Sequence, residues 1–152
     1  MKPAASVLLN NSSSVIALQT ATAIIEAGAG VALLSLPSLT VQLLLGAPLV
    51  TPAALTAARV GGAGLLALGA ASWLACGDTQ SRAAKALLAA MVIYNLGVAF
   101  ILGAAGAGWE RVGVVLWPAV LLHAAMAVWC VASLRNPSTV EAAQSPSEAI
   151  SR

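Results

Sequence analysis

Residues 15–34 have the sequence VIALQTATAIIEAGAGVALL, an apolar run that is interrupted by Gln19 and Glu26. A bilayer core about 30 Å thick is crossed by a helix of around 20 mostly apolar residues, so this run has the length of one membrane span. A charged side chain at the centre of a span costs about 2.5 to 3.5 kcal/mol, whereas each Leu, Ile or Val contributes only about 0.3 to 0.6 kcal/mol. We therefore expect Glu26 to face protein and not lipid.

Three further apolar runs have the same character. They cover residues 55–75, 84–105 and 112–134. Hydrophobic residues make up 60% of the chain and charged residues only 8%, against roughly 25% charged in an ordinary soluble domain. The runs are rich in Ala, Gly and Leu and lack the alternation of barrel strands. The sequence predicts an all-α polytopic membrane protein, with four transmembrane helices in one bundle.

The remaining segments complete the domain organisation. Residues 1–14 are expected to be a short cytoplasmic segment, residues 15–135 the transmembrane domain, and residues 136–152 a disordered cytoplasmic tail rich in Ser, Pro and Glu. Residues 36–50 carry no charge and are too short to span. They predict a short helix that lies in the interface or re-enters the membrane. Thr51 followed by Pro52 is typical of a capped helix start.

Basic residues in short loops indicate the orientation, because they favour the cytoplasmic side. With a cytoplasmic N-terminus, the basic residues on the inside are Lys2, Arg82, Lys85, Arg135 and Arg152. Only Arg59 and Arg111 fall toward the outside. We expect both termini in the cytoplasm.

The tryptophans and cysteines fit this orientation. Trp73 and Trp129 approach the inner interface and Trp109 the outer one, as amphipathic rings prefer. Cys76 and Cys130 fall near the reducing side, so no disulfide is expected between them.

Polar residues within the spans predict one buried cluster. Gln19, Thr22 and Glu26 recur at helical spacing and so share a stripe of the first span. Arg59 enters from the outer side of the second span, and we expect it to pair with Glu26. Hydrogen-bonding neighbours at similar depth are Tyr94, Asn95 and His123. The simplest role of this cluster is to fix helix packing.

Small residues in the second span predict close helix contact. Its glycines are Gly61, Gly62, Gly64 and Gly69. Glycine lets two helix backbones approach closely in a membrane. The run is not a nucleotide-binding loop, because no strand precedes it.

Several chemistries find no support in the sequence. The chain has one histidine, and its two cysteines match no metal or thiol-redox spacing. It lacks the HExxH and GxSxG motifs of hydrolases. We expect no metal, no cofactor and no nucleic acid partner. The expected partners are the lipid bilayer and either another membrane protein or a second copy of the chain.

Four stretches carry a resemblance to a known group: EAGAGVALLSLPSLTVQLLLGAPL (26–49), ARVGGAGLLALGAASWLA (58–75), YN (94–95) and LWPAVLLHA (116–124). Together they resemble a group of small four-helix bacterial membrane proteins. The resemblance covers most of the chain from Glu26 to Arg135. It implies a bacterial inner-membrane location and no established activity, so it implies no catalytic residues.

A second resemblance concerns the position of Glu26 in the first of four short helices. This arrangement is similar to that of the small multidrug-resistance carriers, dimers whose glutamate exchanges protons for cationic drugs. The chain departs from them in its uncharged segment after the first span, in its charge bias and in Arg59. Pairing with Arg59 would hold the Glu26 carboxylate ionised, which suits proton exchange badly.

These observations leave three hypotheses for function. The first is a non-enzymatic accessory or interaction component whose polar cluster stabilises the bundle or docks a partner. The second is a small carrier, proton-coupled, that uses Glu26 and His123. The third is a membrane enzyme in which His123, Tyr94 and Glu26 act as acid and base groups.

Overall fold

The computed structural model describes residues 4–78, 81–108 and 110–135, and every regular element within them is a helix. The helices are α1 (Ala4–Ser35), α2 (Pro37–Leu45), α3 (Pro52–Leu74), α4 (Arg82–Gly108) and α5 (Leu116–Arg135). Within the described residues, four segments are long and apolar enough to cross a membrane: Ser13–Ser35 of α1, and all of α3, α4 and α5. The predicted all-helical class with four span-length helices is confirmed.

The largest differences between the predicted and observed helix boundaries are at the starts of α1 and α5. Helix α1 begins at Ala4 and not near Val15. It therefore includes most of residues 1–14, which were predicted to be a separate N-terminal segment. Helix α5 begins at Leu116 and not near Val112, because the preceding residues are held in a loop against α2. The predicted tail, residues 136–152, lies outside the described residues.

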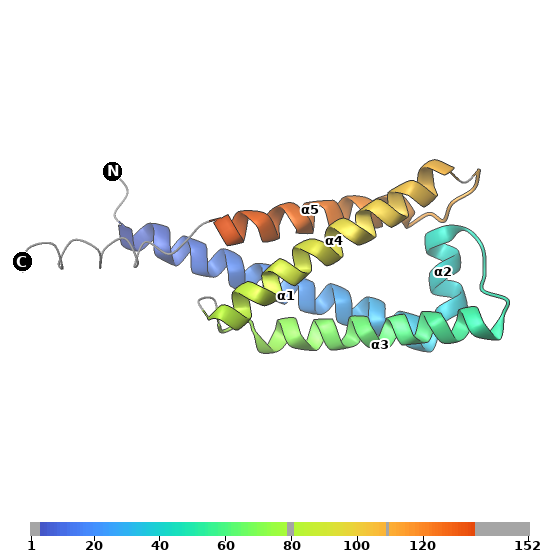
Figure 1. The fold of residues 1–152 in the computed structure, drawn as a ribbon, viewed down its shortest axis with the longest axis horizontal. Coiled ribbons are helices and arrows are strands. Elements are labelled where there is room, and N and C mark those ends of the chain that lie inside the picture. The colour runs from blue at the N-terminus through green and yellow to red at the C-terminus, as the bar shows by residue number, and fades with distance from the viewer. Residues whose placement is uncertain (1–3, 79–80, 109, 136–152) are drawn as a thin grey trace, which may run out of the picture.

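The long helices form two pairs (Figure 1). Helix α1 packs along α3, and α4 packs along α5. The start of α1, the end of α3, the start of α4 and the end of α5 lie at one end of the bundle. We call this the open-loop end. Arg82, Lys85 and Arg135 therefore share an end, and α2 lies at the other.

Helix α2 closes the far end of the bundle. It contacts α1, α3 and α5 and runs across the direction of the long helices (Figure 1). Its Leu43 carbonyl accepts a hydrogen bond of 3.1 Å from the Val115 backbone N–H. A side chain at Gly113 would overlap the Leu43 carbonyl oxygen, so the loop before α5 lies directly on α2. Gly46 ends α2 with a φ of 83°, a conformation that favours glycine.

Helix α3 starts as the sequence predicts. Thr51 is its N-cap residue, and the Thr51 Oγ1 accepts a hydrogen bond of 3.2 Å from the Ala54 N–H. Pro52 occupies the first turn, where its missing N–H costs nothing.

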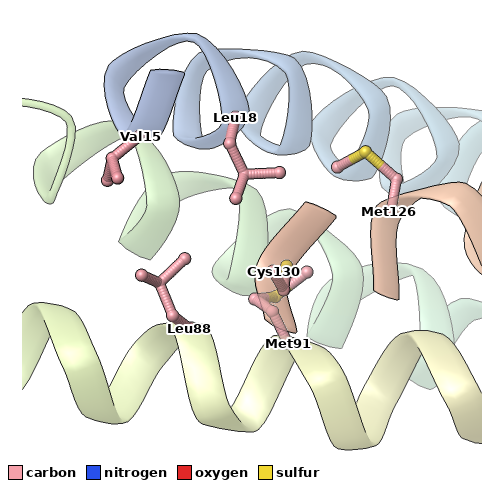
Figure 2. Packing of buried hydrophobic residues seen from close by; sticks show 6 residues of the cluster. All are labelled: Val15, Leu18, Leu88, Met91, Met126 and Cys130. Atoms are coloured by element: carbon pink, nitrogen blue, oxygen red, sulfur yellow. The ribbon is translucent and has the colours of Figure 1, made fainter. Parts of the chain in front are cut away.

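The two helix pairs meet through a small apolar core (Figure 2). Its buried members are Val15, Leu18, Leu88, Met91, Met126 and Cys130. They come from α1, α4 and α5, and Leu68 of α3 packs against them. Away from this core the long helices expose large apolar side chains, such as Ile93, Phe100 and Val128, each at least 70% exposed.

Glycine packing joins α1 to α3. A Cβ atom added at Gly62 would lie 2.9 Å from the Gly30 carbonyl oxygen, and one added at Gly69 would lie 2.8 Å from the Ala27 nitrogen. Both positions therefore require a hydrogen in place of a side chain. Gly61 and Gly64 face away, and a Cβ there would meet no atom within 4 Å. Of the four glycines predicted to pack, two lie in the α1–α3 contact.

We predict opposite effects of alanine at two adjacent positions. Gly62→Ala should lower the free energy of unfolding in detergent by about 1 to 3 kcal/mol, because the new methyl group forces the α1 and α3 backbones apart. Gly61→Ala, the matched control, should leave it unchanged or raise it by up to about 1 kcal/mol through helix propensity. Thermal unfolding followed by circular dichroism measures both. Equal stabilisation by the two changes would contradict the α1–α3 contact.

Candidate functional site

Glu26 lies on α1 where this helix faces the α4–α5 pair. Its side chain is 3% exposed. The hydroxyl of Tyr94 on α4 donates a hydrogen bond of 2.9 Å to the Glu26 Oε2. The carboxyl group is thus held between the two helix pairs, away from the outer surface of the bundle.

A second hydrogen bond joins α4 to α5. The Asn95 side chain is 1% exposed, and its Oδ1 lies 2.8 Å from the His123 Nδ1. The Asn95 Nδ2 donates to the Met91 carbonyl oxygen at 2.8 Å. Because a carbonyl oxygen only accepts, this bond fixes the amide orientation and leaves Oδ1 as the acceptor. The proton between Asn95 and His123 therefore resides on the imidazole Nδ1.

The two hydrogen bonds are connected through an aromatic contact. The rings of Tyr94 and His123 lie edge to face, with centroids 5.7 Å apart and planes at 83°. Glu26, Tyr94, His123 and Asn95 thus form a continuous set of contacts across α1, α4 and α5. We call these four residues the polar bridge.

Arg59 does not belong to the polar bridge, and the expected ion pair with Glu26 is not formed. Arg59 is exposed on α3. Within the described part of the chain, its guanidinium has no hydrogen bond or ion pair. The nearest partner of the Glu26 carboxyl is an uncharged hydroxyl.

The register of α1 against α3 explains this correction. Gly62 lies opposite Gly30 and Leu33, and Gly69 lies opposite Ala23 and Ala27. The part of α3 level with Glu26 is therefore near residues 66–69. Arg59 is seven to ten residues away, which at the helical rise is about 10 to 15 Å along the axis. This separation exceeds the reach of its side chain.

Two polar side chains beside the bridge have no partner. Gln19, 2% exposed, lies on the same stripe of α1 as Glu26 and Thr22. Neither its Oε1 nor its Nε2 finds a hydrogen-bond partner among the described residues. Ser72 of α3, 1% exposed, also has an unpartnered hydroxyl. Ser72 is not among the residues predicted from the sequence, although its spacing of three from Gly69 places it near the face that contacts α1.

Two further polar contacts lie toward the open-loop end. The Trp129 indole N–H donates to the Ser14 hydroxyl at 3.1 Å, which ties α5 to α1. The Thr20 hydroxyl lies 3.5 Å from the Cys76 thiol, which links α1 to the end of α3. Trp109, an expected interface residue, lies outside the described residues, and Trp73 is exposed near the end of α3.

The polar bridge offers groups that accept and donate protons. Tyr94 contacts both of the others: its hydroxyl bonds the Glu26 carboxyl, and its ring lies against the His123 imidazole. Within residues 4–78, 81–108 and 110–135, no three His, Cys, Asp or Glu side chains gather as a metal site would require. The bridge can therefore join helices through hydrogen bonds and can hold a proton on Glu26 or His123.

Comparison with protein families, with curated proteins and with solved structures gives no match to this chain.

A double-mutant cycle tests which residue Glu26 contacts. Glu26→Leu, which removes the acceptor, and Tyr94→Phe should show a coupling of about 0.5 to 1.7 kcal/mol in the free energy of unfolding, as interhelical hydrogen bonds in membrane proteins do. Glu26→Leu and Arg59→Gln, the control pair, should be additive within about 0.5 kcal/mol because the two sites are far apart. Coupling of Glu26 to Arg59, with none to Tyr94, would contradict the observed geometry.

Proposed function

We propose that this chain is a multi-pass protein of the bacterial inner membrane, with both termini in the cytoplasm, and that it acts as a non-enzymatic accessory or interaction component. Four helices of span length support the membrane placement. The large apolar side chains exposed along these helices support it further, since lipid would cover them.

The positions of the basic residues support the orientation. Arg82, Lys85 and Arg135 lie at the open-loop end, which the charge bias assigns to the cytoplasm. Helix α2 then lies at the outer end. Its nine residues are about 13.5 Å long, and it runs across the bundle, which favours an interfacial position over re-entry.

The proposed interaction role rests on the exposure of Arg59. It is a permanent cation on an otherwise uncharged helix, and it has no partner among the described residues of its own chain. Arginine within a span is costly unless it is paired or reaches the interface. Arg59 lies about two turns inside the α2 end of α3, so an acidic side chain of another membrane helix would stabilise it there.

Photocrosslinking in native membranes tests this role. A photoreactive amino acid at Ala63, one turn from Arg59, should give a discrete crosslinked product with a membrane protein or a second copy. Arg59→Gln should reduce its yield several-fold, whereas the thermal stability of the isolated chain should not change, because the Arg59 guanidinium has no hydrogen bond or ion pair among the described residues. Arg111→Gln is the control for loss of one positive charge at the same end.

Crosslinking only to lipid, or a yield insensitive to Arg59→Gln, would contradict the interaction role.

A proton-coupled carrier is the second candidate, and the partner of Glu26 favours it. An ion pair with Arg59 would hold Glu26 ionised and so disfavour proton exchange, but the partner of Glu26 in the structure is the Tyr94 hydroxyl. In this case Glu26→Gln should abolish pH-driven uptake into vesicles while the protein stays folded. Arg59→Gln, the matched change outside the bridge, should retain uptake. Unchanged uptake with Glu26→Gln would remove this candidate.

A further inference from the structure

Gln19 lies where both helix pairs meet. Its neighbours Val15 and Leu18 belong to the core formed with α4 and α5. On its other side, Ala23 lies against Gly69 of α3, and Thr20 lies against Cys76. The Gln19 amide is therefore enclosed by protein and not by lipid, yet both of its polar atoms lack a partner.

Ser72 reaches the same region from α3. It lies one turn before Cys76, whose thiol donates to the Ser72 carbonyl oxygen at 3.4 Å, and one turn after Gly69. Since Cys76 lies beside Thr20 and Gly69 beside Ala23, Ser72 is level with this part of α1. Three unpartnered atoms, the two of the Gln19 amide and the Ser72 hydroxyl oxygen, thus lie within about one helical turn of each other along the bundle.

A ligand that satisfies these unpartnered atoms must both donate and accept hydrogen bonds. An unpaired buried amide or hydroxyl costs about 1 to 3 kcal/mol or more, and native structures satisfy such groups almost without exception. The Gln19 Nε2 needs an acceptor and its Oε1 needs a donor, so a simple cation or anion would satisfy only part of the set. Water meets both needs and typically binds two to four such groups.

Polar groups continue from this level to the surface and toward the centre of the bundle. Beside Gln19, Thr20 and Cys76 are partly exposed. Toward the centre, buried Thr22 leads to Glu26 on the same stripe. The steps from Gln19 to Thr22 and from Thr22 to Glu26 are about 4.5 and 6 Å of helical rise, which one or two water molecules bridge.

The other side of Glu26 is closed. One turn further along α1, a Cβ added at Gly30 would lie 2.7 Å from both the Gly62 carbonyl oxygen and the Leu66 nitrogen. The α1 and α3 backbones therefore meet there without intervening side chains. The α1–α3 contact at Gly69 meets the backbone at Ala23 and Ala27, beside the stripe that carries Gln19, Thr22 and Glu26.

We propose that Gln19 and Ser72 bind water and form a one-sided hydrated path that connects the open-loop end of the bundle to Glu26. The path enters beside Cys76 and Gln19, passes Ser72 and Thr22, and stops at the Gly30–Gly62 contact. It gives the polar bridge contact with one aqueous side only, the side from which Glu26 could take up or release a proton.

Silver ions test the path, because Ag⁺ binds thiolates, is small enough to follow a chain of water and does not cross lipid. The test rests on the proposed membrane insertion and uses sealed vesicles with Cys130→Ala.

One variant retains only Cys76 as the entrance control. In the others Cys76→Ser is combined with a single new cysteine: Ser72→Cys, which is nearly isosteric, or Gln19→Cys. Two matched controls are Leu18→Cys, buried in the apolar core, and Ile24→Cys, on the outer surface of α1.

We expect Ag⁺ on the open-loop side to protect Ser72→Cys and Gln19→Cys from later maleimide labelling at least about tenfold faster than Leu18→Cys. Ag⁺ on the α2 side should protect neither. The path would be contradicted if Ser72→Cys were protected as slowly as Leu18→Cys while Cys76 reacts and Ile24→Cys stays slow. That result would leave the membrane placement intact. Rapid reaction of Ile24→Cys would contradict the membrane placement itself.

Discussion

The structure depends on how one buried carboxyl group is held. Glu26 is nearly inaccessible, and the Tyr94 hydroxyl bonds it across the boundary between the two helix pairs. The backbones of α1 and α3 make close contact, as do those of α4 and α5, whereas the two pairs meet mainly through side chains. A specific polar contact at this boundary fixes how the pairs are placed, because apolar side chains alone tolerate sliding.

Two kinds of packing divide the bundle along its length. Toward α2, the Gly30–Gly62 contact brings two backbones together, and α2 lies across the end. Toward the open-loop end, α1 and α3 stay in contact at Gly69, and the buried polar groups Gln19, Thr22 and Ser72 lie near that contact. Glu26 lies at the transition between these regions. The chain therefore combines a closed half and a half in which polar groups extend toward the surface.

Sequence periodicity was sufficient to predict the helices, but not their relative register. The apolar runs and the Thr51–Pro52 cap gave the class and the start of α3, since these features are local. The predicted pairing of Glu26 with Arg59 is wrong because it assumes that the ends of each apolar run lie at the same depth in the bilayer. The glycine contacts instead shift α3 along α1 by two to three turns from that alignment. Tyr94, Asn95 and His123 could be proposed as neighbours, but their hydrogen-bond partners depend on helix rotation, which composition does not encode.

The single tyrosine of the chain makes the central contact directly measurable. Solid-state NMR of the protein in bilayers, with ¹³C at the Tyr94 Cζ and at the glutamate Cδ atoms, reports carbon pairs at hydrogen-bonding separation. We predict one Tyr–Glu cross-peak that disappears in Glu26→Gln and persists in Arg59→Gln. A spectrum of the folded protein without that cross-peak would contradict the account.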